Sequence, residues 1–199
     1  MGQVFSRIAF IAGLGAALSL PVAAATSEWQ IDPAHSSAQF AVKHLSISTV
    51  RGAFTSVKGT VQFDNADITK SSVDVTIDVN SVDTRVEARD KDLRSDHFFD
   101  VEHYPTITFK STKIEQVAPG KLKVVGNLTI HGITKEATLD VDGPTSPIND
   151  PWGNQRMGLN ASTKILRKDF GVGTGYGPAM IGDEISITID AEMFHKLAK

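Results

Sequence analysis

The chain has no cysteine at any of its 199 positions. Disulfide bridges and a cysteine nucleophile are therefore excluded, and so is attachment of a lipid through an N-terminal cysteine. The fold must be stabilised by side-chain packing and strand pairing alone.

Long apolar stretches are also scarce. The uncharged run Ile8–Leu20 has 13 residues, which is short of the ~20 that a membrane-spanning helix requires. Arg7 precedes this run, and Ala23–Ala25 supply the small residues of a signal-peptidase site. We therefore expect residues 1–25 to be a cleaved secretory signal, with an uncleaved anchor as the alternative. Residues 26–199 would then form one domain without stable membrane insertion.

An excess of positive charge is missing. The chain has 20 Lys and Arg against 23 Asp and Glu, and removal of Arg7 with the signal leaves 19 against 23, a net charge of −4. Nucleic-acid-binding domains are usually basic, so nucleic acid is not an expected partner. The 174 residues that remain from 199 after removal of 25 are enough for a single domain with its own core.

Motifs for catalysis, metals and nucleotides are absent as well. There is no G-x-S-x-G elbow for a nucleophilic serine and no HExxH pair for zinc. His97 and His103 lie among carboxylates, but they straddle two segments, so we predict no metal site. The glycines of Gly171–Gly177 are not followed by Lys-Ser/Thr or by a helical pattern, and we expect a flexible loop there. The chain is therefore not expected to be an enzyme or to need a cofactor.

What the chain does have is alternation of apolar and polar residues. The clearest stretch is Val73–Asn80, where Val73, Val75, Ile77 and Val79 alternate with polar residues. Such alternation predicts strands with one buried and one wet face. The expected strands are 37–43, 51–63, 71–80, 106–113, 121–130, 136–142, 157–165 and 185–192.

Eight strands of this kind must either close into a barrel or pair as a sandwich, and no helical pattern is long enough to cover a second face. We expect an all-β fold, a single antiparallel up-and-down barrel of lipocalin-like type. Small inward residues such as Gly59, Gly126 and Ala161 favour coiling of the strands and an interior that is not filled. A turn at Thr55-Ser56 would break the up-and-down order.

One segment, Val82–Pro105, departs from the strand pattern. Thr84 and Glu87 have capping-box spacing, and Asp90 and Arg94 have the spacing of a helical ion pair. The segment predicts a short helix inserted between two strands. It is either a lid over the barrel or a connection whose phenylalanines fill the core.

Motifs along the whole of 26–199 resemble those of the YceI family. They share their order and spacing with that family: His35-Ser36, Val42–Leu45, Val50–Phe54, Ser81–Thr84, Arg89–Ser95, Phe98–Val101, Tyr104–Phe109, Leu128–Lys135 and Lys168–Gly171. Two positions depart from it, because Asp92 stands where many members have His and His97 where many have Asp.

The resemblance implies a lipocalin-like barrel in the periplasm that encloses an isoprenoid-type or other long-chain amphiphilic lipid. Under this hypothesis inward apolar residues bind the lipid tail: Phe40, Val42, Phe54, Val61, Val75, Ile77, Phe98, Phe99, Phe109 and Leu128.

A polar headgroup would need a few polar groups at the mouth of such a pocket. In an up-and-down barrel His44, Arg51 and Arg94 fall at the same end as the helix, and Arg suits an anionic group. The other readings are a filled barrel with a structural or stress-response role, and an enzyme that acts on an amphiphile. A homodimer is also left open.

Overall fold

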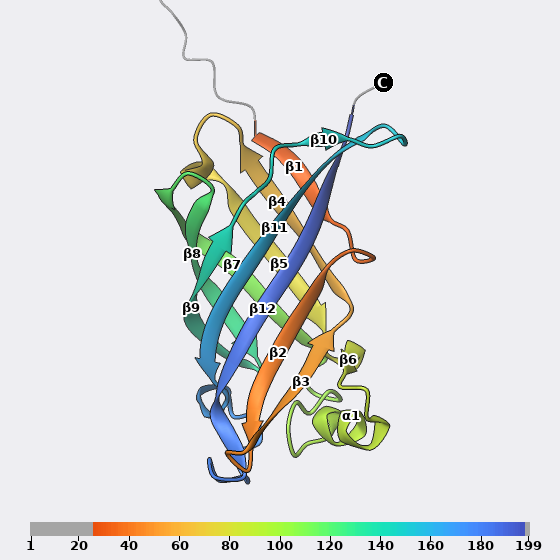
Figure 1. Cartoon of the computed structure of the whole chain (residues 1–199), viewed down its shortest axis with the longest axis vertical. Coiled ribbons are helices and arrows are strands. Elements are labelled where there is room, and N and C mark those ends of the chain that lie inside the picture. The colour runs from red at the N-terminus through yellow and green to blue at the C-terminus, as the bar shows by residue number, and fades with distance from the viewer. Residues whose placement is uncertain (1–25, 198–199) are drawn as a thin grey trace, which may run out of the picture.

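The computed structural model describes residues 26–197, which form one antiparallel sheet closed on itself (Figure 1). Its strand segments, in chain order, are β1 (Thr26–Ile31), β2 (Ser37–His44), β3 (Ser48–Phe54), β4 (Val57–Asp64), β5 (Ser72–Asp78), β6 (Val82–Asp83), β7 (Thr106–Ala118), β8 (Lys121–Ile130), β9 (Ile133–Asp142), β10 (Ile148–Asn149), β11 (Asn154–Leu166) and β12 (Ile181–Lys196). The sheet closes because β11 pairs with both β9 and β12.

The twelve segments make an eight-stranded barrel, because three of its strands are interrupted. Segments β1 and β2 both run antiparallel to β12. Segments β3 and β4 are antiparallel to β2 and β1, and β6 and β5 are antiparallel to β3 and β4. The chain therefore breaks at Thr55-Ser56 without reversing. The predicted up-and-down barrel is confirmed, and β10 is a short addition beside β11.

The two ends of the barrel differ. The helix end, at the bottom of Figure 1, carries α1 (Glu87–Arg94), the β2–β3 turn and the 3-10 helix η3 (Arg167–Phe170). The terminal end carries the start of β1, the end of β12, β10 and the 3-10 helix η1 (Ile68–Lys70). A third 3-10 helix, η2 (Val79–Ser81), links β5 to β6.

The predicted helix exists, but its capping differs from the prediction. Thr84 does not form a capping box with Glu87. Its hydroxyl and its amide both donate to Asp90 Oδ1, at 2.5 and 2.9 Å, and Arg89 Nε donates to the hydroxyl. Arg94 instead donates to backbone carbonyls of η2 and β6. The predicted Asp90–Arg94 pair is therefore absent from the described residues, because a buried Asp90 gains more from two local donors.

The inward faces of the strands form the core, and the largest apolar cluster includes Phe54, Phe98, Phe109, Leu128 and Phe170. The small inward residues were expected to leave the interior unfilled, but not every inward glycine does so. A Cβ on Gly126 would lie 2.5 Å from Phe109 Cζ, so this glycine makes room for a ring instead. Within residues 26–197, no helix is long and apolar enough to cross a membrane.

Candidate functional site

The barrel encloses a cavity of about 250 Å³. Its wall runs from Leu93 of α1 and Phe98 at the helix end to Ile68 of η1 and Pro144 at the terminal end, so the cavity follows the barrel axis. Polar atoms contribute almost nothing to the wall. The volume is near the lower limit of the ~300–1,000 Å³ typical of ligand pockets. A space of this shape suits a slender apolar chain better than a compact ring system.

All ten residues predicted to bind a lipid tail lie on the cavity wall. They are contributed by six strands and by the segment after α1: Phe40, Val42, Phe54, Val61, Val75, Ile77, Phe98, Phe99, Phe109 and Leu128. Period-2 alternation could identify the eight on strands because every second residue of a barrel strand faces inward, whereas Phe98 and Phe99 lie outside the strands. Their contact with a ligand stays a prediction.

Two pairs of aromatic rings lie at the helix end of the cavity. Phe98 stacks on Tyr176 with 5.2 Å between ring centroids, and Phe99 meets Phe54 edge-on at 5.6 Å. Phe98 is buried, and Phe99 is half-buried. Gly173, at φ 61°, allows this packing, since a Cβ there would lie 2.8 Å from the Phe98 ring. The segment after α1 therefore covers the barrel end and fills part of the core at the same time.

A buried cation, Arg167, lies beneath this aromatic layer, and the sequence analysis did not single it out. Its side chain is only 4% exposed and reaches the cavity wall. The guanidinium donates to five backbone carbonyls, those of Val172, Gly173, Tyr176, Ile181 and Gly182. Asp183 Oδ1 lies 2.9 Å from its Nη2 and compensates the charge.

Arg167 holds the loop Gly171–Gly177 in place through hydrogen bonds to its carbonyls. The loop was expected to be a flexible rim segment, but its carbonyls are tied to one guanidinium. An inward position for Arg167 could have been read from the sequence, because it continues the alternation of Ala161, Thr163 and Ile165. With its five N–H groups committed to carbonyls, it offers no free donor to a ligand.

The three residues predicted to bind a headgroup do not lie on the cavity wall. His44 and Arg51 are exposed on β2 and β3. Arg94 donates to the carbonyls of Asn80 and Val82 at 3.0 and 2.7 Å, on the outside of the barrel. Their shared end of the molecule was predicted correctly, but the structure gives them no common pocket. Their headgroup role stays a prediction.

The two positions that depart from the family pattern contact each other. His97 Nδ1 lies 3.0 Å from Asp92 Oδ1, and both side chains are largely exposed. The two residues therefore form a pair on the outer surface. Neither residue reaches the cavity wall.

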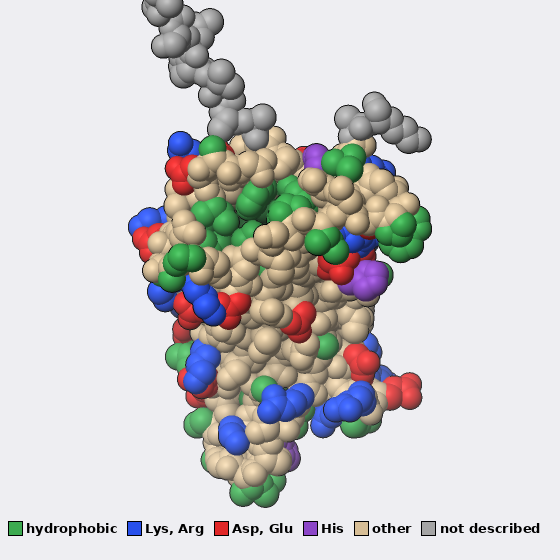
Figure 2. Space-filling model, turned by 45° about the horizontal axis from the view of Figure 1, so that its top comes forward, with side chains coloured by type: hydrophobic (Ala, Val, Ile, Leu, Met, Phe, Trp, Pro, Cys, Tyr) green, Lys and Arg blue, Asp and Glu red, His purple; other side chains and the backbone are tan. Residues whose placement is uncertain are grey.

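The terminal end shows the opening of the cavity. In Figure 2, where this end is turned toward the viewer, apolar side chains gather in a hollow between the loops. Wall residues at this end include Phe63, Ile68 and Pro144, from β4, η1 and the loop after β9. We call this opening the mouth. It lies opposite the end at which the sequence analysis placed the unusual residues.

An unfilled apolar cavity is costly. With ~24 cal/mol of unfolding free energy lost per Å³ of cavity, 250 Å³ corresponds to about 6 kcal/mol. Domains of this kind have a total free energy of unfolding of only ~5–15 kcal/mol. The cavity therefore argues against the filled-barrel alternative, since a purely structural barrel would gain much from larger side chains.

Comparison with known proteins agrees with this architecture. The family model described as a YceI-like domain matches residues 29–193. A UPF0312 protein of Vibrio parahaemolyticus is 39% identical over 165 residues, which cover 82% of this chain and 87% of that protein.

Two solved structures share the fold. The YCEI protein of Campylobacter jejuni has 34% identity and a TM-score of 0.70, covering 78% of this chain and 90% of its own. A polyisoprenoid binding domain from Saccharophagus degradans has 16% identity and a TM-score of 0.63, covering 84% and 98%. The second likeness shows a common fold alone. From the family model and the relatives together, the chain belongs to the YceI-like domain family.

Proposed function

We propose that this protein binds a long-chain lipid of isoprenoid type inside its barrel and shields it from water. The observation that carries the proposal is the cavity, whose wall is apolar along its whole length and which meets an apolar hollow at the terminal end. Burial of apolar surface contributes ~25 cal/mol per Å². A chain that fills the cavity would therefore recover much of the free energy that the empty space costs.

The arrangement of polar groups favours one orientation of the lipid. At the helix end the donors of Arg167 are all used by carbonyls, and aromatic rings line the wall. A buried polar group without a partner is unfavourable by ~1–3 kcal/mol, so a headgroup would be unstable there. We infer that the apolar end of the lipid lies against Phe98 and Phe99. The polar end would then face the mouth.

The solved structure from Saccharophagus degradans is named as a polyisoprenoid binding domain, and that name supports the choice of lipid class for this chain. A role as carrier, store or sequestering protein fits the same cavity. Binding without catalysis is proposed because the wall presents no set of reactive side chains among the described residues.

Secretion to the periplasm is part of the proposal. The predicted signal, residues 1–25, lies outside the described residues, and the domain described begins at Thr26. N-terminal sequencing of the exported protein is expected to start at Thr26. A mature protein that keeps Met1 would contradict the secreted reading.

A series of polyprenyl alcohols tests the proposed ligand class. With delipidated protein, affinity is expected to rise with chain length and to level off once the chain fills the barrel axis. A fused-ring sterol of similar hydrophobicity is the control, and it should bind at least about tenfold more weakly, a difference of ~1.4 kcal/mol. Equal binding of the sterol, or no binding of any chain, would contradict the proposal.

A further inference from the structure

Exposed apolar side chains stand beside the mouth. Ile148 of β10 is 67% exposed, Trp152 in the β10–β11 turn 77% and Leu197 42%. The amide of Leu197 donates to the carbonyl of Gly153 at 3.2 Å, which brings the end of β12 next to the turn. The loop between β9 and β10, which leads into Ile148, contributes Pro144 to the cavity wall. We call Ile148, Trp152 and Leu197 the apolar rim.

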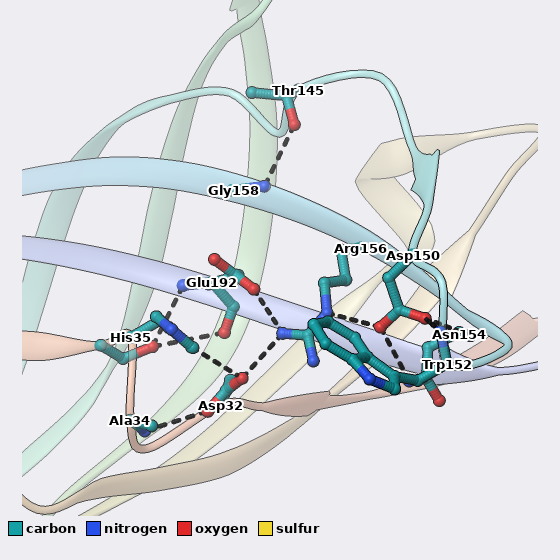
Figure 3. Close-up of polar contacts among 11 residues, drawn as sticks. Asp32, Ala34, His35, Thr145, Asp150, Trp152, Asn154, Arg156, Gly158 and Glu192 are labelled. Carbon is teal, nitrogen blue, oxygen red and sulfur yellow. Dashed lines mark hydrogen bonds and ion pairs between the residues drawn. The ribbon is translucent and has the colours of Figure 1, made fainter.

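The turn that carries Trp152 is held by a cluster of charged side chains (Figure 3). Asp150 Oδ1 accepts the amides of Trp152 and Asn154, at 2.9 and 2.8 Å, and its Oδ2 accepts Arg156 Nε at 2.8 Å. The Arg156 guanidinium continues to Asp32, 2.7 Å away. The exposure of Trp152 is therefore a fixed feature of the surface and does not come from an untethered loop.

The same cluster does not present a metal site. Among the described residues, Asp32, His35 and Glu192 are the group close enough together to hold an ion. Arg156 Nη1, however, already bonds both Asp32 and Glu192. The guanidinium of Arg156 therefore already occupies the position that a metal ion would take. The cluster serves to join β11 and β12 to the β1–β2 connection and to position the turn.

Two observations indicate what covers the apolar rim. Tryptophan is favoured at the interface of a bilayer, where one side of the ring is apolar and the other wet. The rim adjoins the opening of an apolar cavity, from which a lipid chain could pass directly into a bilayer.

The charges at this end indicate how the contact is made. Three lysines there are paired with carboxylates, namely Lys70 with Asp67 at 3.5 Å, Lys121 with Asp142, and Lys123 with Asp140 at 2.9 Å. Lys196, beside Leu197, has no ion pair among the described residues and is a single positive charge at the rim. The three pairs leave no uncompensated positive charge to attract anionic lipid. Contact would therefore depend mainly on apolar burial, which salt does not screen.

We propose that the apolar rim docks the mouth on a lipid bilayer and that the lipid chain passes between bilayer and cavity at this contact. Passage of the lipid chain rests on the proposed function, whereas docking of the rim does not. The rim can bind a bilayer whether or not the cavity holds a lipid.

A rival surface lies at the helix end. Leu45 and Ile47, in the β2–β3 turn, are also exposed, and Lys43 and Arg51 stand near them on a hairpin without acidic residues. Docking there would be sensitive to salt. Phe98 and Phe99 line the cavity at that end and pack against Tyr176 and Phe54, whereas the apolar hollow lies at the terminal end.

Flotation with vesicles of phosphatidylethanolamine and phosphatidylglycerol (3:1) distinguishes the two surfaces. The variant Ile148→Ser, Trp152→Ser is expected to lower the partition coefficient onto the vesicles at least about tenfold, which corresponds to ~1.4 kcal/mol. The matched control is Leu45→Asn, Ile47→Ser, in which Asn tolerates the φ of 50° at position 45. It should bind like the wild type, and binding should change less than twofold between 50 and 500 mM salt.

The opposite pattern, with binding lost in the control variant or abolished by salt, would overturn the proposal. Sedimentation without vesicles is run in parallel, because a rim that joins two copies of the chain would give a dimer that the rim variant disrupts, and this also would overturn it. Retention of polyprenyl alcohol by the rim variant in solution separates the two proposals. A variant that holds the lipid but does not float shows that only docking has been removed.

Discussion

Single charged residues hold loops in place at both ends of the barrel. Arg167 bonds the carbonyls of the η3–β12 loop. Arg156 of β11 joins Glu192 of β12 to Asp32 and Asp150, which lie in the β1–β2 and β10–β11 connections. Neither arginine was singled out from the sequence, because the identity of a charged residue does not reveal which distant groups it meets. The inward direction of Arg167 could be predicted from the alternation of the strand before it, but the carbonyls that it bonds could not.

The Arg156 cluster predicts a dependence of stability on pH. The hydrogen bond from Arg156 lowers the pKa of Asp32 from its usual 3.8 to about 2. A carboxyl with a lowered pKa in the folded state contributes stability above its unfolded pKa, and this contribution is lost as the pH falls from about 4 to about 2. The difference in free energy of unfolding between wild type and Asp32→Asn should therefore be constant above pH 5 and shrink below pH 4. Urea denaturation at several pH values measures it.

The control for this measurement is Asp96→Asn, which removes a carboxylate that is 84% exposed. It should differ little from the wild type at any pH, since exposed ion pairs contribute only ~0–1 kcal/mol. A constant difference for Asp32→Asn down to pH 2 would contradict the role assigned to Arg156.

The small wall residue Ala161 offers a direct test of the cavity. Ala161 is buried, and its side chain faces the space. Ala161→Phe should fill part of the cavity, reduce the amount of lipid that the protein holds several-fold and leave the lipid-free protein as stable as the wild type or more so. Ala41→Phe, on the outward face of β2, is the matched control and should leave lipid content unchanged. If the cavity were an ordinary packed core, Ala161→Phe would instead cost on the order of 1–3 kcal/mol.

The element that the sequence marks as unusual, Val82–Pro105, covers the barrel end and packs into it as well. Its helix could be predicted from local spacing, and α1 lies within the predicted segment. Its caps could not, because Thr84 and Asp90 are buried against one another, and tertiary burial overrides the capping-box pattern. The sequence left two alternatives for this segment, a lid over the barrel or a connection that fills the core. The buried Phe98 fits the second and the half-buried Phe99 fits the first.

The two phenylalanines of this segment should therefore behave differently. Phe98→Ala removes a ring that is 7% exposed and stacked on Tyr176, and it should lower the free energy of unfolding by about 3–5 kcal/mol, as in a core. Phe99→Ala removes a half-buried ring and should cost clearly less, while speeding release of the lipid. Chemical denaturation and stopped-flow release distinguish them. Equal losses of stability would contradict a division between plug and lid.

For the whole molecule, alternation along eight strands predicted an antiparallel all-β fold, but it fits a sandwich as well as a barrel. The small inward residues and the resemblance to the YceI family favoured the barrel, which the pairing of β11 with both β9 and β12 confirms. The inward positions of the strand residues predicted to bind a lipid tail followed from the alternation, whereas Phe98 and Phe99 lie in the segment after α1. The position of the mouth was not predictable, because it depends on which loops cross the barrel ends, as the loop through Pro144 does. The unusual residues near α1 pointed to the helix end, where the structure instead shows rings and a fully bonded Arg167.

One slender lipid is proposed to occupy the barrel. Native mass spectrometry of the protein purified from its own host tests this most directly, with Ala161→Phe measured beside the wild type. We predict a complex of one protein with one long-chain lipid of isoprenoid type, which is depleted in the variant and unchanged in Ala41→Phe. A wild-type spectrum that shows only lipid-free protein, together with no uptake of polyprenyl alcohol, would contradict the account.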